Sequence, residues 1–481
     1  MGSKQKKAKD NDNEPQPQSN GEDIKKALDW VLTEGIFADV CVHGNVKWIP
    51  LTLVRVAIFW VWSSEAGLVE SAKSAIGKVA KLFGNAGVKS YQVMMGALAR
   101  YTPQLLPRLW KRMQTLMLAC SSVGGRVGKW LPLAVDGSRV GVPRTHKNEE
   151  RFCKPKSQKK RGKKGRKRGR HAKPKAKQKR RTKSHYDPQP VGPQMWLTLI
   201  WHIGLRLPWC WKLGPSYSSE RDHFRAMLQE QKFLDQTLFC ADAGFVGYDF
   251  WRAILAKDHH FLIRVGGNVR LLKKLGYSRK GKDIVYCWPN EAIEGKLLPL
   301  VLRLLRFHDG HNEVYLVTSV LDEKELTHEQ ASSIYRSRWG IEVQFRSLKQ
   351  TYDRTKLRSR TPEHAELEMH WSLLGLTMLQ LLALKEQSRP GEPPDKASIA
   401  GVLRVVRSMI AECSEKQGLG ESMQERLREA TVDTYERSSK KKSRNYPRRK
   451  EEPSTGKPII VEATAHHKAK LDEISSYAQA A

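Results

Sequence analysis

Two short apolar segments that each run directly into an aspartate constrain the fold of this chain more than any other feature. Residues 131–135 lead into Asp136, and residues 237–241 lead into Asp242. Short apolar runs that stop at turn-forming residues are typical of buried strands. Further strands are expected at 195–203, 207–213 and 261–265, and helices at 220–233 and 248–257. This order of strands and helices predicts a mixed α/β sheet that is covered by helices.

Both aspartates are expected at the ends of strands, where open α/β sheets place their ligands. If residues 131–135 and 237–241 form adjacent parallel strands, Asp136 and Asp242 lie side by side. Two neighbouring carboxylates repel each other unless a cation lies between them, and Mg²⁺ prefers oxygen ligands. The sequence therefore predicts a metal site here. A turn or a helix N-cap is the ordinary alternative for each aspartate.

The regions on either side of this sheet differ from it in pattern. Residues 1–20 are polar, which predicts a disordered tail. Residues 21–125 read as helices, compatible with a DNA-binding helix-turn-helix or with an ordinary helical hairpin. Residues 266–326 are rich in Gly and in short β-like runs, which predicts a β-rich insertion. The remaining expected parts are a core at 126–265 and 327–390, a disordered basic loop at 147–190 within it, and a helical and basic C-terminal region at 391–481.

Positive charge dominates the composition. The 481 residues include 85 Lys and Arg against 50 Asp and Glu, which gives a formal net charge of +35. Residues 154–183 carry 18 of these cations and no acid, and residues 437–450 carry eight. Such runs are typical of a solvated tail, or of a segment that binds nucleic-acid phosphates with a strong salt dependence. Charge alone leaves DNA, RNA and a membrane surface open as partners.

The composition also excludes several classes of protein. Hydrophobic residues make up 40% of the chain, so a fully disordered protein, a collagen and a disulfide scaffold are ruled out. The seven cysteines are scattered without a Cys-x-x-Cys pair, which argues for a reducing compartment and against a zinc knuckle. The most apolar segments, 53–62 and 371–384, are shorter than the ~18–20 residues that span a bilayer. We expect buried helices there, and no membrane partner.

The clearest chemical pattern lies in a predicted helix at 327–352. Four polar residues share one stripe of this helix: Tyr335, Arg338, Glu342 and Lys349. At about 100° per residue they fall within about 60° of one another. The neighbouring stripe is apolar and would face the core; it consists of Ile334, Ile341, Phe345 and Leu348. A carboxylate and two cations beside a buried face can serve an active site. The plain alternative is a surface ion pair between Arg338 and Glu342, worth about 0.3–0.5 kcal/mol.

The spacing Tyr-x2-Arg-x3-Glu-x6-Lys, from Tyr335 to Lys349, resembles the signature of the DDE transposases of the insertion-sequence-four (IS-four) family. The segment that begins at Asp242 is similar to the family's second aspartate motif, and Val135-Asp136-Gly137-Ser138 is similar to its first. The order of two aspartates, a β-rich insertion and a glutamate also resembles that family. The similarity covers about residues 131–387, roughly half of the chain.

The resemblance implies an α/β fold, with an RNase H-like catalytic core that carries an inserted β subdomain and follows a helical N-terminal domain. It implies that Asp136, Asp242 and Glu342 are the catalytic carboxylates and hold two ions of Mg²⁺ or Mn²⁺, the arrangement used for phosphoryl transfer. Similar transposases grip the phosphate near the cleaved end with residues that correspond to Tyr335, Arg338 and Lys349.

Some family members cut the second DNA strand through a hairpin and stack a flipped base on an aromatic residue of the insertion. Trp288 is the candidate for this DNA-binding role, and a core position within the insertion is the alternative. The implied partners are transposon ends and target DNA. We further expect a homodimer on paired ends, in the bacterial cytoplasm at the nucleoid.

The predicted function is metal-dependent cleavage and strand transfer of DNA at the ends of an insertion sequence, without a covalent protein–DNA intermediate. Two alternatives remain. One is a catalytically inactive or domesticated basic DNA-binding protein, and the other is an RNase H-like nuclease that acts by hydrolysis alone. The presence of three carboxylates and two phosphate-binding cations favours activity. A nuclease would not need a long terminal DNA-binding region, which favours the transposase.

Overall fold

The computed structural model describes residues 20–120, 125–155, 192–279, 281–308, 313–388, 397–412, 422–431 and 456–480. The chain divides into two compact units. The helical unit combines residues 1–124 with 371–442, and the sheet unit combines residues 125–370 with 443–481. The sequence had predicted a different division, in which residues 391–481 formed a region of their own.

The helical unit is built from segments far apart in the chain. Its elements are α1 (Asn20–Val31), η1 (Glu34–Phe37), α2 (Pro50–Trp62), α3 (Leu68–Phe83), α4 (Tyr91–Ala119), α11 (Pro362–Gln387) from Trp371 onward, α12 (Ile399–Glu412) and α13 (Met423–Glu429). The almost wholly buried α2 holds them together. The indole N–H of Trp62 donates to the carbonyl of Gly375 at 3.0 Å, and Nε of Arg407 donates to the carbonyl of Trp62 at 2.8 Å. The C-terminal helices therefore complete the N-terminal ones.

Helix α4 is longer than the pattern predicts. The sequence predicts a helix over residues 88–101. Beyond it, Pro103 and Pro107 lack the amide N–H that a helix interior uses. The helix instead begins after Ser90, whose hydroxyl accepts a hydrogen bond from the Val93 N–H at 3.3 Å, and it continues to Ala119. Its buried stripe continues past both prolines, through Leu105, Leu109, Met113 and Met117. Burial of this stripe outweighs the backbone bonds that the prolines remove.

Helix α11 has 26 residues and is long and apolar enough to cross a membrane, judged by length and composition alone. Its most apolar stretch is 94% buried within the protein. Core helices pass the same test.

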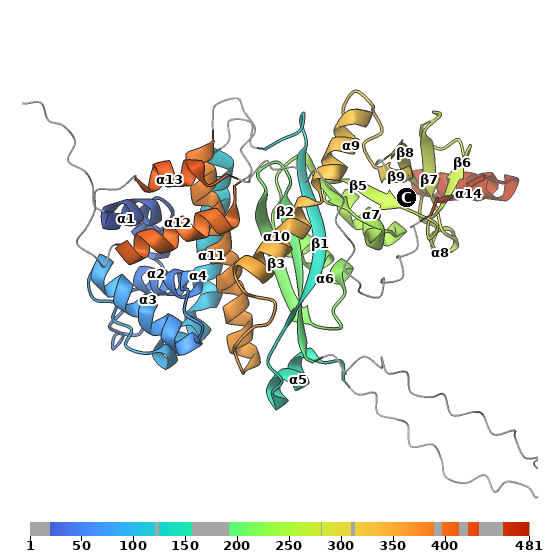
Figure 1. Cartoon of the computed structure of the whole chain (residues 1–481). Coiled ribbons are helices and arrows are strands. Elements are labelled where there is room, and N and C mark those ends of the chain that lie inside the picture. Colours follow the sequence, from blue (N-terminus) through green and yellow to red (C-terminus); the bar gives the residue numbers. More distant parts are fainter. Residues whose placement is uncertain are drawn as a thin grey trace, which may run out of the picture. The chain divides into compact units, whose positions relative to one another are not determined.

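The sheet unit contains one mixed ten-stranded sheet in the order β10-β6-β7-β8-β9-β5-β4-β1-β2-β3. Figure 1 shows the strands with the helices that lie along them. The strands are β1 (Leu131–Gly141), β2 (Gln194–His202), β3 (Leu207–Pro215), β4 (Thr237–Ala241), β5 (His260–Val265), β6 (Arg270–Lys273), β7 (Ile284–Cys287), β8 (Leu300–His308), β9 (Glu313–Thr318) and β10 (Ile459–Glu462). The helices of this unit are α5 (His146–Phe152), η2 (Ala243–Phe245), α6 (Glu220–Glu230), α7 (Tyr248–Leu255), α8 (Asn290–Glu294), α9 (His328–Ser337), α10 (Gly340–Arg346), η3 (Ser347–Thr351), the start of α11, and α14 (Ala465–Ala480).

The predicted mixed α/β sheet is confirmed. Strands β1, β2 and β3 form an antiparallel meander. Strand β4 runs parallel to β1, with Leu131 opposite Thr237 and Ala134 opposite Cys240, and β5 runs parallel to β4. Helix α6 leads from β3 to β4, and α7 leads from β4 to β5. The two aspartate-bearing strands are therefore neighbours, as the sequence analysis required for a shared site.

The strands of the predicted insertion extend this same sheet. Strand β9 pairs antiparallel with β5, and β8, β7 and β6 follow in turn. Strand β10 arrives from residues 459–462 and pairs parallel with β6. A segment that follows the long basic stretch at 437–450 thus forms one edge of the sheet.

The predicted basic loop begins later than residue 147. Residues 147–152 belong to α5, whose start is capped by Thr145, because its hydroxyl accepts from the Asn148 N–H at 3.3 Å. The buried Phe152 anchors the end of this helix. Residues 1–19, 156–191 and 432–455 lie outside the described residues, and so do most of the predicted loop, the second basic run and the predicted N-terminal tail.

Candidate active site where β1 and β4 diverge

Asp136 and Asp242 occupy equivalent positions on neighbouring parallel strands. The paired register ends at Ala134 and Cys240, and each aspartate lies two residues beyond that pair. Asp242 follows the end of β4, as predicted. Asp136 does not end its strand, because β1 continues to Gly141 along β2. The two side chains therefore lie at the point where β1 leaves β4, and not at two strand ends.

Each aspartate uses one carboxylate oxygen locally. Oδ1 of Asp136 accepts from the Gly137 N–H at 2.8 Å, and Oδ1 of Asp242 accepts from the Gly244 N–H at 2.8 Å. Asp242 thereby also caps η2, so the N-cap alternative holds for it in addition to any other role. The second oxygen of each carboxylate has no hydrogen bond to the described residues.

The helix that carries the four-residue polar pattern is interrupted. Helix α9 ends at Ser337 and α10 begins at Gly340, and the backbone N–H groups of Trp339 and Glu342 each bond to the carbonyl three residues before. A side chain on Gly340 would collide with the ring of Trp201 on β2. Only glycine therefore fits at this position. The apolar stripe is buried as predicted: Ile334, Ile341, Phe345 and Leu348.

Arg338 lies within the site and not on the surface. Its side chain is 12% exposed, and Nη2 is 3.9 Å from Oε1 of Glu342, too long for a tight ion pair. Burial alone would lower the pKa of this guanidinium, but nearby groups that include Asp136 and Asp242 raise it. Its Nε is buried without a hydrogen-bond partner among the described residues. The predicted pair of Arg338 and Glu342 is therefore present as a long contact, but its arginine is buried and not on an exposed surface.

The charges of the predicted carboxylates act on one another. Burial raises the pKa of Asp136, and Asp242 raises it further, whereas the Gly137 N–H and Arg338 lower it. The Glu342 side chain is 35% exposed. Burial raises its pKa, Arg338 opposes the rise, and Asp136 and Asp242 add to it. Glu342 on α10, which packs against β1, thus shares an electrostatic site with both aspartates.

A fourth carboxylate, Glu220, was missed by the sequence analysis. It is the first residue of α6, and its pKa is raised to about 7 by burial, Asp136 and Asp242. An acid in the first turn of a helix is ordinary, since it faces the positive end of the helix dipole. The sequence therefore carried no signal that separated Glu220 from other helix-start acids.

The other predicted contacts also lie close by. Nζ of Lys349 donates to the hydroxyl of Ser138 at 2.7 Å, which ties η3 to β1 just beyond Asp136. Burial lowers the pKa of Lys349 and raises that of Tyr335. The Arg338 guanidinium lies 5.5 Å from the centre of the Tyr335 ring. Three side chains of the pattern thus border the site that holds Glu342.

Trp288, the predicted base platform, is buried elsewhere in the sheet unit. Its side chain is 4% exposed, and its indole N–H donates to the carbonyl of Leu297 at 2.7 Å. Its surroundings match the alternative reading, a core position. Stacking on a base would require this ring to leave its position. Trp339, next to Arg338, is 55% exposed, and the sequence analysis did not single it out.

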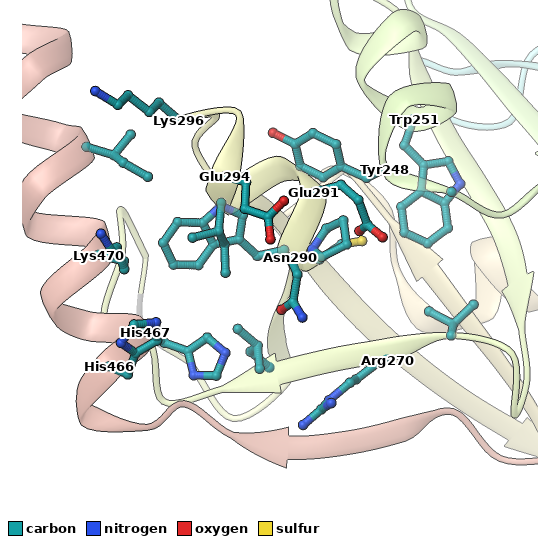
Figure 2. Close-up of a pocket in the computed structure, with 18 of the residues that line it drawn as sticks. Tyr248, Trp251, Arg270, Asn290, Glu291, Glu294, Lys296, His466, His467 and Lys470 are labelled. Atoms are coloured by element: carbon teal, nitrogen blue, oxygen red, sulfur yellow. The ribbon is translucent and has the colours of Figure 1, made fainter.

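Trp288 also lines a cavity of about 890 Å³ between α7, α8, β6 and α14. Figure 2 shows Glu291 and Glu294 of α8 opposite His466, His467 and Lys470 of α14. Acids and bases face one another across this pocket, and none of Asp136, Asp242 and Glu342 lines it. This pocket is thus separate from the carboxylate site.

The carboxylate site suits a hard divalent cation by the chemistry of its donors. Mg²⁺ and Mn²⁺ prefer carboxylate oxygens, and Asp136 and Asp242 each keep an oxygen without a hydrogen bond to the described residues. Among those residues, no three His, Cys, Asp or Glu side chains already lie at the spacing of metal ligands. This is compatible with the effect of the carboxylates on one another's pKa. Charges influence one another over distances longer than the ~2.1 Å of a bond between a metal ion and its ligand. The carboxylates would have to move closer together to bind one ion.

Comparison with known proteins defines the class. Residues 199–378 match the family described as a transposase DDE domain. The match includes Asp242 and Glu342, and Asp136 precedes it. Over these residues the chain is therefore similar to a transposase DDE domain.

A curated relative gives a second similarity in sequence. Over 215 residues the chain is 27% identical to the transposase InsG for insertion sequence element IS4 of Escherichia coli K12. The aligned region covers 41% of this chain and 46% of that protein. The predicted resemblance to the IS-four family is confirmed, although the chain matches only about half the length of this relative. A solved piggyBac transposase synaptic complex with hairpin DNA is similar over 86% of each chain, at 10% identity and a TM-score of 0.38. The class rests on the two sequence matches.

Proposed function

We propose that this protein is a DDE transposase, which cleaves DNA at the ends of an insertion sequence and joins those ends to target DNA. The observation that carries the proposal is the group of Asp136, Asp242 and Glu342, which come from β1, β4 and α10 and act electrostatically on one another and on Arg338. Two of the three acids lie within the matched DDE domain. Acids whose pKa is shifted by burial and by neighbouring charges, grouped beside a buried cation, are typical of catalytic sites.

The proposal includes an RNase H-like core. Its support is a sheet in which the first three strands form an antiparallel meander and the next two run parallel to the first, with α6 and α7 as the connections. The β-rich segment between β5 and α9 is then the insertion that the family resemblance implies.

The three carboxylates would hold two ions of Mg²⁺ or Mn²⁺. When bound, such ions stabilise the charge on the attacking and leaving oxygens of a phosphoryl transfer. The protein's part is to supply oxygen donors at fixed positions. Asp136 and Asp242 are fixed by the parallel register of β1 and β4, and Glu342 by the contact of Gly340 with Trp201.

Arg338 and Lys349 would orient the phosphate. The buried Nε of Arg338 is a donor without a partner among the described residues, which suits an anionic ligand. The Lys349 ammonium now donates to Ser138 and can turn to a phosphate oxygen nearby. Fixing the phosphate in line with its attacking group is a large part of catalysis of this kind. The attacking groups are water and then a DNA 3′-hydroxyl, so no protein nucleophile is needed.

The two alternatives are less well supported. A domesticated DNA-binding protein would need no buried cation among grouped acids, and that arrangement is intact here. The three acids would serve a nuclease that acts by hydrolysis alone as well as they serve a transposase. The sequence matches, however, are to transposases.

The proposal extends to a homodimer on paired ends. Light scattering of the protein with and without a duplex that carries one transposon end measures this directly. We expect the mass of the complex to correspond to two chains and two ends. A complex with one chain and one end would contradict it.

The test of the function is strand cleavage by Glu342→Gln. This change keeps the size and hydrogen-bonding capacity of the side chain and removes its charge. We expect cleavage of a labelled transposon-end duplex with Mg²⁺ to be lost, while a gel shift shows nearly unchanged end binding. Glu412→Gln in α12 is the matched control and should cleave normally. Wild-type cleavage by Glu342→Gln would overturn the assignment.

A further inference from the structure

Glu220 is held in place by the start of α6. The helix is capped by Ser219, whose hydroxyl accepts from the Asp222 N–H at 3.3 Å. Helix α6 packs against β1, β2 and β3. Its first residue therefore faces the sheet close to the point where β1 leaves β4.

The Glu220 carboxyl lies directly over the backbone next to Asp136. A Cβ atom at Gly137 would be 2.6 Å from Oε1 of Glu220, and 2.7 Å from Cδ and from Cγ. No side chain fits at residue 137 while Glu220 keeps this position. Gly137 does not have a positive φ angle, so glycine is required here for space and not for backbone conformation. The carboxyl of Glu220 thus lies beside the residue that directly follows Asp136.

A negative charge at this position is disfavoured by its neighbours, and a bound cation would offset that cost. Asp136 and Asp242 both repel a charge on Glu220, and the opposing effect of Arg139 is smaller. A carboxylate on the solvent-facing side of the first turn of α6 would be stabilised by the helix dipole to the same extent. The dipole alone therefore does not explain why Glu220 faces the sheet. Glu230, at the other end of the same helix, is in that situation: its carboxylate pairs with Lys212 at 2.6 Å and is 54% exposed.

We propose that Glu220 is a fourth acidic residue of the divalent-ion site, and that its carboxylate helps to hold the ion beside Asp136 and Asp242. The inference rests on the proposed function, because that function supplies the reason for a divalent ion. It adds a residue that lies outside the three-carboxylate pattern, on a helix that the pattern does not include.

The test measures ion binding and not activity. Isothermal titration of the full-length protein with Mn²⁺ gives the affinity without DNA. Glu220→Gln removes the charge and keeps the volume over Gly137. We expect its Mn²⁺ affinity to fall roughly 10–100-fold, the usual effect of removing a group that supports a metal site. Glu230→Gln is the matched control, the same change on the same helix, and should bind Mn²⁺ as the wild type does.

Two further variants keep the test decisive if Glu220→Gln is poorly folded. Glu220→Asp retains the charge on a shorter side chain and should recover part of the lost affinity. Gly137→Ala retains Glu220 but displaces its carboxyl, so it should weaken Mn²⁺ binding although no acid has been removed. Wild-type affinity in both Glu220→Gln and Gly137→Ala would overturn the inference.

The same titration separates this inference from the proposed function. Asp136→Asn should lose Mn²⁺ binding if the proposed site is correct. Loss in Asp136→Asn with full binding in Glu220→Gln would remove Glu220 and leave the function intact. No Mn²⁺ binding by the folded wild type, judged by circular dichroism, would contradict the metal site and therefore both proposals.

Discussion

Two regions of the sheet unit gather acids and bases, and they are built differently. Where β1 and β4 diverge, Asp136, Glu220 and Glu342 have their pKa raised by burial and by neighbouring acids, with Arg338 as the buried cation among them. In the pocket between α8 and α14, charges compensate one another locally. Lys470 pairs with Glu473 at 2.7 Å, which lowers the pKa of Glu473.

The difference shows that the volume of a hollow is a poor guide to chemistry. The pocket of about 890 Å³ offers paired charges and a buried tryptophan. The carboxylate site offers like charges that are held together by the register of two strands and by a glycine contact. Concentrated like charge is costly, and it is retained where a cation or a substrate gains from it.

The largest expected difference in cleavage rate is between two variants, each of which neutralises one acid of one region. Asp136→Asn should reduce strand cleavage by roughly 10³-fold or more, as for other residues that act within a catalytic group. Glu294→Gln in the pocket should leave cleavage within about twofold of the wild type. Both rates come from one assay, single-turnover cleavage of a transposon-end duplex with Mg²⁺. Equal losses in the two variants would mean that the pocket belongs to the active site.

The next contrast is between two tryptophans. Trp288→Ala removes a buried ring and should lower the free energy of unfolding by about 3–5 kcal/mol. Trp339→Ala removes an exposed ring and should change it by less than about 0.5 kcal/mol. Thermal unfolding of both variants measures the difference. If a base stacks on Trp339, its loss should weaken end binding by about 1–3 kcal/mol; an unaltered gel shift would exclude that contact.

A third contrast concerns two lysines. Lys349→Ala removes a cation that lies beside Ser138, and should slow cleavage of a bound end about tenfold or more, because a charged hydrogen bond contributes about 1.5–3 kcal/mol. Lys470→Ala in the pocket removes the partner of Glu473 and should not change the cleavage rate. A larger loss in Lys470→Ala would place DNA against the pocket.

The smallest effect is expected from a glycine. Gly340→Ala should destabilise the sheet unit by about 1–3 kcal/mol, because its new methyl group meets the Trp201 ring. Gly96→Ala in α4 meets nothing within 4 Å, and should stabilise the helical unit by about 0.5–1 kcal/mol. Denaturant unfolding followed by circular dichroism checks both signs. A stabilised Gly340→Ala would show that the glycine is not needed for packing.

The sequence was informative where the pattern is local. Apolar runs predicted the strands, and the equivalent positions of Asp136 and Asp242 followed once β1 and β4 proved to be parallel neighbours. The buried stripe that contains Ile341 was read correctly from helical spacing. These features depend on neighbours within a few residues, or on one pairing of strands.

The sequence failed where a distant residue decides. Trp201 packs against Gly340 just before Glu342, yet the tryptophan and the glycine lie far apart in the sequence. Glu220 is singled out by the position of its carboxyl over Gly137, which is distant in the sequence. The residues next to Glu220 in the sequence do not distinguish it from other acids. Helix α4 continues past Pro103 because of packing that the proline rule does not include. Tertiary contact, not local preference, decided each of these cases.

The edge strand β10 has a consequence for how the protein is made. Strand β6 gains this neighbour only when residues 459–462 have been synthesised, long after the rest of the sheet has left the ribosome. Until then one border of the sheet presents free backbone donors and acceptors, which readily pair with other chains. Nascent chains, and products of early termination before residue 459, should therefore be more prone to aggregation than the finished protein.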